Sequence, residues 1–80
     1  MFVQHQNQLE AKFVFEDFTT AFAFMTEVAF LAERQNHHPN WSNVYNTVTI
    51  QLTTHDAGNT ITAKDHHLAE GIERIFKKYK

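Results

Sequence analysis

The stretch Leu9-Glu10-Ala11-Lys12-Phe13-Val14-Phe15-Glu16-Asp17-Phe18 decides the fold, because two kinds of regular structure meet in it. Apolar residues alternate with charged ones from Leu9 to Phe15, and this period of two predicts a strand with one buried face. Asp17 is a predicted N-cap for a helix that runs to about Gln35. The chain is therefore expected to pass from a half-buried strand directly into a long helix.

This helix carries an apolar surface wider than packing on a sheet requires. One seam at helical spacing consists of Phe18, Phe22, Met25, Ala29 and Ala32. A second strip beside it consists of Ala21, Phe24, Val28 and Leu31. Together the two strips cover roughly half of the circumference, whereas one sheet requires a stripe of about 100°. We therefore expect the helix to pack against another subunit as well.

More strands are predicted on both sides of this unit. Residues Phe2 to Gln6 are expected to form its hairpin partner, with a turn at Asn7-Gln8. The alternation from Val44 to Thr54 predicts a long antiparallel strand, whose polar face continues to His55. Residues Asn59 to Ile61 are expected to form a short last strand.

A second helix is predicted after these strands. Thr62 and Asp65 have the spacing of a capping box, in which each side chain bonds to the backbone N–H of the other residue. The core stripe of this helix is expected to consist of Leu68, Ile72, Ile75 and Tyr79. The resulting order β-β-α-β-β-α predicts an α+β fold, with a four-stranded antiparallel sheet and two helices packed on one face.

Length and composition set the class of protein. The 80 residues, of which 42% are hydrophobic, predict a single domain over residues 1–80. This size is near the limit for one core, so we expect a homo-oligomer. The net charge of −2 argues against a nucleic-acid partner. Neither a signal peptide nor an apolar run of about 20 residues is present, and there is no cysteine, so we expect no membrane association and a cytoplasmic location.

The histidines are the candidate functional residues. They occur in the run Asn36-His37-His38-Pro39-Asn40-Trp41 and in Thr54-His55-Asp56. Pro39 is expected to end the preceding helix and to hold His38 outside the helical region. The run Ala57-Gly58-Asn59 is expected to turn the chain after His55. Imidazoles at such ends of regular structure more often serve a site than a core.

Two kinds of chemistry suit these histidines. Two imidazoles that converge from different elements would supply a general acid and a general base near neutral pH. Metal binding is the alternative, although the neighbours His37 and His38 rarely reach one ion and no HExxH spacing is present. The other histidines, His5, His66 and His67, are expected to be solvated surface residues. The residues alone leave both alternatives open.

Several motifs together are similar to the pterin-4a-carbinolamine dehydratase family, over roughly Phe13 to Ile75. They are Phe13-x-Phe15-x-Asp17-Phe18, Ala21-Phe22-x-Phe24-Met25, Ala32-Glu33, His37-His38-Pro39-x-Trp41, Asn43-Val44-Tyr45-Asn46, Thr54-His55-Asp56 and Asp65-x-x-Leu68-Ala69. The doubled histidine with proline and tryptophan, followed in order by the next two motifs, is the specific part of this resemblance.

The resemblance implies an activity and a set of site residues. Enzymes of this family dehydrate 4a-hydroxytetrahydropterins to quinonoid dihydropterins in tetrahydrobiopterin recycling, without a metal or an organic cofactor. By resemblance, His37 and His55 carry the acid–base catalysis, and either of them could be the acid or the base. The expected substrate-binding residues are His38, Trp41, Glu33, Asp65 and Lys64.

The resemblance also implies an assembly and an alternative function. Family members form homodimers or homotetramers, which here would use the first helix and the sheet edge. The N-terminal helix usual in the family is expected to be lacking. Because a family member in animals is also a dimerisation cofactor for a homeodomain transcription factor, the alternative function is a non-catalytic protein-binding module.

Overall fold

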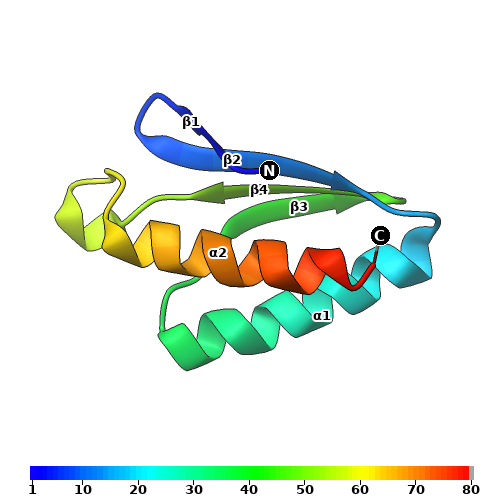
Figure 1. Ribbon diagram of the computed structural model, residues 1–80. Helices are drawn as coiled ribbons and strands as arrows, with labels where there is room; N and C mark the ends of the chain where they lie inside the picture. The colour runs from blue at the N-terminus through cyan, green and yellow to red at the C-terminus, as the bar shows by residue number, and fades with distance from the viewer. Residues whose placement is uncertain (80) are drawn as a thin grey trace.

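The computed structural model of the protein describes residues 1–79, and within them the chain forms one antiparallel sheet and two α-helices. The elements are β1 (Val3–His5), β2 (Gln8–Val14), α1 (Phe18–Gln35), β3 (Asn40–Val44), β4 (Thr47–Leu52), the short 3-10 helix η1 (His55–Ala57) and α2 (Ala63–Lys77). The sheet order is β1-β2-β4-β3. Helices α1 and α2 lie side by side on one face of the sheet (Figure 1). The predicted α+β class and element order are confirmed.

The core lies between the sheet and the two helices. Alternate residues of β2 and β4 point into it, as the period of two requires. The buried residues of these strands and of Phe15 just after β2 face the buried residues of α1 and α2, and the largest are Phe13, Phe24, Ile50, Leu52, Leu68 and Ile72. The Phe13 ring packs against Phe24 at 5.2 Å and against Phe76 at 4.8 Å between centroids. Each such aromatic side chain contributes about 1.5–3 kcal/mol by leaving water.

The prediction of one long strand from Val44 to Thr54 is wrong, because a tight turn after Val44 separates two strands that form a hairpin. Strand β3 ends at Val44, β4 begins at Thr47, and Tyr45 at the turn has a left-handed φ of 50°. The Asn43 side-chain amide donates to Tyr45 O at 3.1 Å and to Thr47 O at 2.9 Å. These bonds hold the turn without a glycine. Val44 is consequently 76% exposed rather than on the buried face.

Two smaller strand predictions also need correction. The first turn lies at Gln6 and Asn7 rather than at Asn7-Gln8, with Gln6 at a φ of 58°. The predicted last strand from Asn59 to Ile61 forms only an isolated bridge between Thr54 and Thr60. Strand β3 takes its place as the fourth strand of the sheet, so the predicted element order holds with different strand boundaries.

Capping residues define the ends of α1. The Asp17 carboxylate accepts from the backbone N–H of Thr20 at 2.8 Å, which confirms the predicted N-cap. The helix ends at Asn36, whose φ of 53° is left-handed and whose N–H bonds back to Ala32 O and Glu33 O. The helix therefore stops before Pro39 is reached, because an asparagine tolerates the left-handed conformation at a C-cap.

The two apolar strips of α1 have different environments. The core-facing side consists of Ala21, Phe24, Val28 and Ala32, mostly from the second strip. Phe18 and Phe22 of the first seam are 48% and 54% exposed, and their rings contact each other. An exposed apolar face thus remains on α1, and its contact with another subunit stays a prediction. Within residues 1–79, neither α-helix is long and apolar enough to cross a membrane.

Candidate active site

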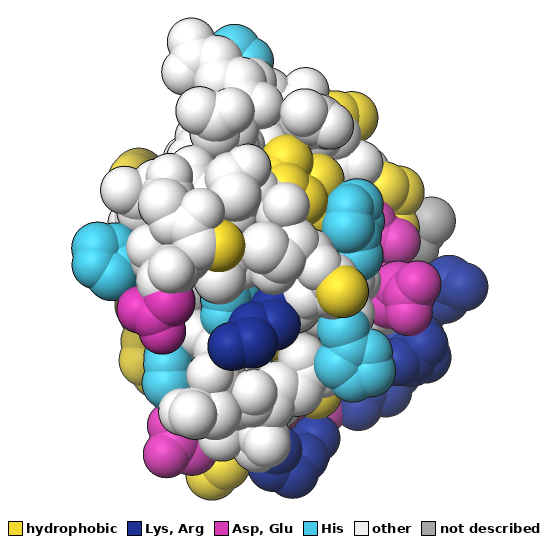
Figure 2. Space-filling view, turned by 90° about the vertical axis from the view of Figure 1, so that its left-hand side faces the viewer, with side chains coloured by type: hydrophobic (Ala, Val, Ile, Leu, Met, Phe, Trp, Pro, Cys, Tyr) yellow, Lys and Arg dark blue, Asp and Glu magenta, His cyan; other side chains and the backbone are white. Residues whose placement is uncertain are grey.

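A pocket of about 260 Å³ lies at the end of the sheet where α1 ends, η1 forms and α2 begins. It is lined by Asn36, His37, His38, Thr53, Thr54, His55, Asp56 and Lys64. Figure 2 looks onto this end of the molecule and shows histidine side chains gathered around a basic side chain. Of the predicted site residues, His37, His38, His55 and Lys64 therefore share one pocket.

Local backbone structure presents the histidines from two sides. On one side, the left-handed Asn36 redirects the chain after α1, and the His37 N–H bonds to Ala32 O at 3.1 Å. On the other side, His55 opens η1, which Gly58 closes with a φ of 83° and an N–H bond to His55 O at 3.1 Å. The predicted turn after His55 is confirmed, and the two imidazoles come from different elements.

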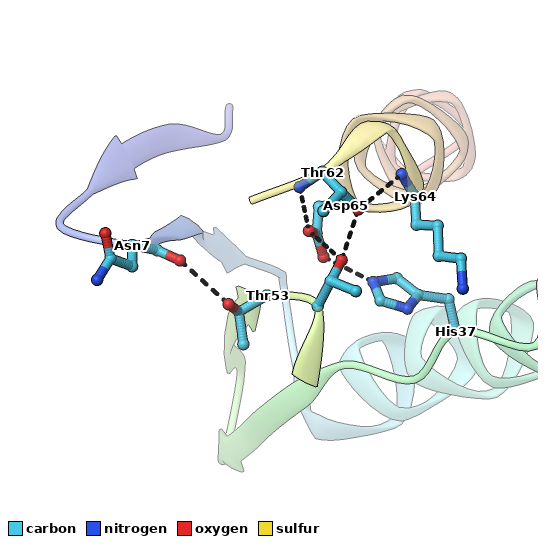
Figure 3. Close-up of polar contacts among 7 residues, drawn as sticks. Asn7, His37, Thr53, Thr62, Lys64 and Asp65 are labelled. Carbon is cyan, nitrogen blue, oxygen red and sulfur yellow. Dashed lines mark hydrogen bonds and ion pairs between the residues drawn. The ribbon is translucent and has the colours of Figure 1, made fainter. Parts of the chain in front are cut away.

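His37 is paired with a buried carboxylate. Its Nε2 lies 2.6 Å from Asp65 Oδ1, and the two side chains are 12% and 0% exposed. Asp65 Oδ2 accepts from Thr54 Oγ1 at 2.7 Å and from the backbone N–H of Thr62 at 2.9 Å (Figure 3). Both oxygens of Asp65 are thus held by hydrogen bonds, as a buried carboxylate requires.

The environment keeps Asp65 ionised. Burial acts to raise the pKa of Asp65, but hydrogen bonds from His37, Thr62 and Thr54 outweigh it, so the pKa lies below its usual value. Asp65 also completes the predicted capping box of α2 with Thr62. One carboxylate therefore caps a helix with Oδ2 and holds an imidazole with Oδ1.

The other two pocket histidines have weaker partners. His38 Nε2 lies 2.9 Å from Glu33 Oε1, and these side chains are 59% and 79% exposed. His55 Nδ1 lies 3.2 Å from Asn59 Oδ1 near the protein surface. Both rings are thus accessible to a ligand, whereas the ring of His37 is mostly enclosed.

Three of the predicted site residues, Glu33, Asp65 and Trp41, lie around the pocket rather than on its wall, whereas Lys64 is on the wall. Glu33 reaches it only through His38, and Asp65 lies beneath His37. Trp41 on β3 is partly buried against the hydrophobic core. Lys64 lines the pocket, and its backbone N–H donates to Thr62 Oγ1 at 3.2 Å.

Thr54 is a site residue that the sequence analysis did not single out. It is 6% exposed and continues the inward-facing register of Val48, Ile50 and Leu52 beyond the end of β4. A polar residue on the buried face of a strand is the signal that would have identified it. Thr53, Asp56 and Asn36 also line the pocket, but their sequence context carries no comparable signal.

The metal-binding alternative requires several ligands arranged around one ion. Within residues 1–79, no group of three histidine, aspartate or glutamate side chains is arranged to hold a metal ion. The pocket histidines instead contact single partners, namely Asp65, Glu33 and Asn59.

Fold and pocket together define a class of protein: a small α+β domain with a histidine-lined pocket at one end of its sheet. The family model described as pterin 4 alpha carbinolamine dehydratase matches residues 2–75. The chain belongs to this family, whose name denotes a hydro-lyase.

Relatives of known sequence agree with this membership. A protein of Prochlorococcus marinus strain MIT 9515, provisionally named a pterin-4-alpha-carbinolamine dehydratase, is 53% identical over 72 residues, which are 90% of this chain and 74% of the relative. A protein of Synechococcus strain WH7803 with the same provisional name is 54% identical over 68 residues, 85% of this chain and 72% of its own length.

Solved structures share the fold. A Brucella melitensis protein described as a transcriptional coactivator/pterin dehydratase has a TM-score of 0.84 at 39% identity, over 94% of this chain and 79% of that one. A pterin dehydratase-like protein, described as a RuBisCO assembly factor in the alpha-carboxysome, has a TM-score of 0.75 at 20% identity, over 94% of this chain and 86% of that one. The second likeness shows the fold alone.

Proposed function

We propose that the protein dehydrates a 4a-hydroxytetrahydropterin to a quinonoid dihydropterin, with His37 and His55 as the general acid and base. The observation that carries the proposal is that these imidazoles, from the end of α1 and the start of η1, line one pocket. Family membership supports the substrate class. The absence of cysteine also suits a cytoplasmic reaction.

The reaction needs two proton transfers. The bond from C4a to the hydroxyl oxygen breaks while one imidazolium gives that oxygen a proton, so that water leaves. The other imidazole takes a proton from a ring N–H of the pterin. The electron pair of this N–H bond then completes the new carbon–nitrogen double bond. One histidine has then lost a proton and the other has gained one, and exchange with solvent restores both. Such acid–base steps each contribute typically 10²–10⁴-fold in rate.

The remaining residues have supporting roles in this proposal. Asp65 holds His37 by Nε2, which leaves Nδ1 as the nitrogen that exchanges a proton with the substrate. His38 and Lys64 on the pocket wall bind and orient the pterin. Glu33 steadies His38 from the pocket edge, and Trp41 supports the start of β3.

The test is an assay of 4a-hydroxytetrahydropterin dehydration, with the substrate generated in situ. Because each imidazole carries one proton transfer, His37→Ala and His55→Ala are expected to lower kcat by about 10²–10⁴-fold. His5→Ala on β1 is the matched control, since this exposed histidine lies outside the pocket. A wild type that does not accelerate the reaction over buffer, or full activity in both pocket variants, would contradict the proposal.

A second candidate function is protein binding through α1. The supporting observation is the exposed apolar face that includes Phe18, Phe22 and Phe30, the last 66% exposed. The Brucella melitensis relative, described as both a coactivator and a dehydratase, agrees with a dual role in the family. A folded chain without dehydratase activity, in a stoichiometric complex that Phe22→Glu disrupts, would favour this function.

We also propose that the chain forms a homodimer or homotetramer through α1 and a sheet edge. Large apolar side chains exposed together on one helix are the supporting observation. Light scattering measures the mass in solution. Phe22→Glu is expected to reduce it, and a wild-type monomer would contradict the assembly.

A further inference from the structure

A chain of hydroxyl groups lies beneath His37. Thr54 Oγ1 is 2.7 Å from Asp65 Oδ2 and 2.6 Å from Thr62 Oγ1. Thr62 Oγ1 in turn accepts the backbone N–H of Lys64 at 3.2 Å. Figure 3 shows these contacts joining the end of β4 to the first turn of α2. The groups thus form one continuous path from the backbone of α2 to the carboxylate that holds His37.

The protons in this path can run in only one direction. An ionised carboxylate only accepts, so the single Thr54 hydroxyl proton points to Asp65. In the hydrogen bond between Thr54 and Thr62, the Thr62 hydroxyl must then be the donor and the Thr54 oxygen the acceptor. The Thr62 oxygen is left as an acceptor, and the N–H of Lys64 satisfies it. The backbone N–H of Lys64 can only donate, so the direction of donation along the path is fixed.

The same accounting determines the tautomer of His37. Asp65 Oδ2 already accepts from Thr54 and from the Thr62 N–H, and Oδ1 faces the ring at 2.6 Å. Because this carboxylate has no proton to give, the ring must donate from Nε2. A neutral His37 consequently carries its proton on Nε2, and Nδ1 is its free basic nitrogen.

We propose that Thr54 is a positioning residue for His37, which fixes the Nε2-protonated tautomer by holding Asp65 through a one-way hydroxyl chain. The inference rests on the proposed function for its effect on rate, but the tautomer itself is a property of the folded protein. Thr54 touches neither His37 nor a reacting atom in this arrangement and acts only through Asp65.

Other charged groups around His37 belong in the design of a test. Lys64 faces the pocket from α2, His55 and Asp56 face it from η1, and His38 with its partner Glu33 lies on the α1 side. The variants below leave all of these side chains unchanged. A measured difference therefore arises from the hydroxyl chain.

The kinetic test compares Thr54→Val with Thr54→Ser. Valine keeps the shape but removes the hydroxyl, so kcat is expected to fall by about tenfold with little change in KM, since Asp65 loses one of the hydrogen bonds that hold it. Serine keeps the hydroxyl and is expected to restore most of kcat. Thr49→Val, on the other face of β4, is the matched control. Full kcat in Thr54→Val, or serine as impaired as valine, would overturn the inference.

Nitrogen-15 NMR of the histidine rings, at a pH where they are neutral, tests the tautomer directly. Wild type is expected to show His37 protonated on Nε2, and Thr54→Val to show a mixture of the two tautomers. A wild-type ring protonated on Nδ1, or an unchanged tautomer in a folded Thr54→Val, would overturn the inference. Because this measurement needs no turnover, it tests the inference even where the dehydratase assay fails. Its first arm needs no variant and tests the tautomer of His37 even where Thr54→Val does not fold.

Discussion

Two neighbouring histidines, His37 and His38, each contact a carboxylate, yet the two pairs have opposite surroundings. In the first pair, the side chains of His37 and Asp65 are 12% and 0% exposed, and three donors hold the carboxylate. In the second pair, the side chains of His38 and Glu33 are 59% and 79% exposed, and one contact joins them. The distances, 2.6 and 2.9 Å, differ far less than the exposures.

The difference shows that burial and secondary hydrogen bonds, rather than sequence proximity, decide what a histidine–carboxylate pair can do. A pair in water is screened and contributes about 0–1 kcal/mol. A buried, fully bonded carboxylate holds one ring orientation and one charge state. We therefore expect His37 to be a rigid catalytic group and His38 an adaptable binding group.

The largest expected contrast is in catalysis by the carboxylate variants. Asp65→Asn removes the charge that orients His37, so kcat is expected to fall by about 100-fold, which corresponds to the loss of a hydrogen bond between charged groups. Glu33→Gln is the parallel change in the exposed pair and is expected to alter KM by less than about threefold, because such a pair is screened by water. Steady-state kinetics of both variants measures the contrast, and equal losses in the two would remove the distinction between the pairs.

The next contrast concerns stability against acid. Since the pKa of Asp65 is lowered in the folded state, its contribution to the free energy of unfolding is fully present above its unfolded pKa of about 3.9 and is lost as pH falls through the folded value.

Asp65→Asn is therefore expected to be less stable than wild type by about 2 kcal/mol at pH 7, through the lost cap and buried hydrogen bonds. The difference should shrink towards pH 3 and below. Urea unfolding at pH 7, 5 and 3 measures it. A constant difference across this range would show that ionisation of Asp65 does not stabilise the fold.

The smallest contrast is in the direct coupling energy of the pairs. A double-mutant cycle on His38 and Glu33 is expected to give under about 0.5 kcal/mol of coupling, as for exposed ion pairs. The cycle on His37 and Asp65 is expected to exceed about 1.5 kcal/mol, as for a hydrogen bond to a charged group. Thermal unfolding of the four single and two double variants supplies the values, and a stronger coupling in the exposed pair would reverse the comparison.

The elements that local patterns specify could be predicted from the sequence. In β2, buried and exposed residues alternate as the sequence pattern predicts. The caps at Asp17 and Thr62 depend on hydrogen bonds to residues only a few positions away. The turn at Tyr45 was not predicted, because Val44 and Val48 stay in phase across it and the polar Asn46 alone interrupts their face. Asn43 holds the turn locally, whereas the Asn46 side-chain amide donates to the distant Phe15 O at 3.0 Å.

The same distinction applies to the candidate site. The positions of His37 and His55 at structural breaks are local features, so the histidines could be singled out in advance. The burial of Asp65 under His37, and the contact of Thr54 with Asp65, join β4, α1 and α2 and depend on the tertiary fold. The sequence therefore indicated which histidines lie at this pocket, whereas the division of the histidine–carboxylate pairs into buried and exposed ones required the structure.

The capping box of α2 has a consequence for local motion. The backbone N–H of Thr62 and the ring of His37 are tied to the same carboxylate, so fraying of the first turn of α2 and release of the ring are a single opening event. Helix ends ordinarily open far more often than a whole domain unfolds. Amide hydrogen exchange at the start of α2 should therefore report how often His37 is free to turn, in a protein with no ligand bound.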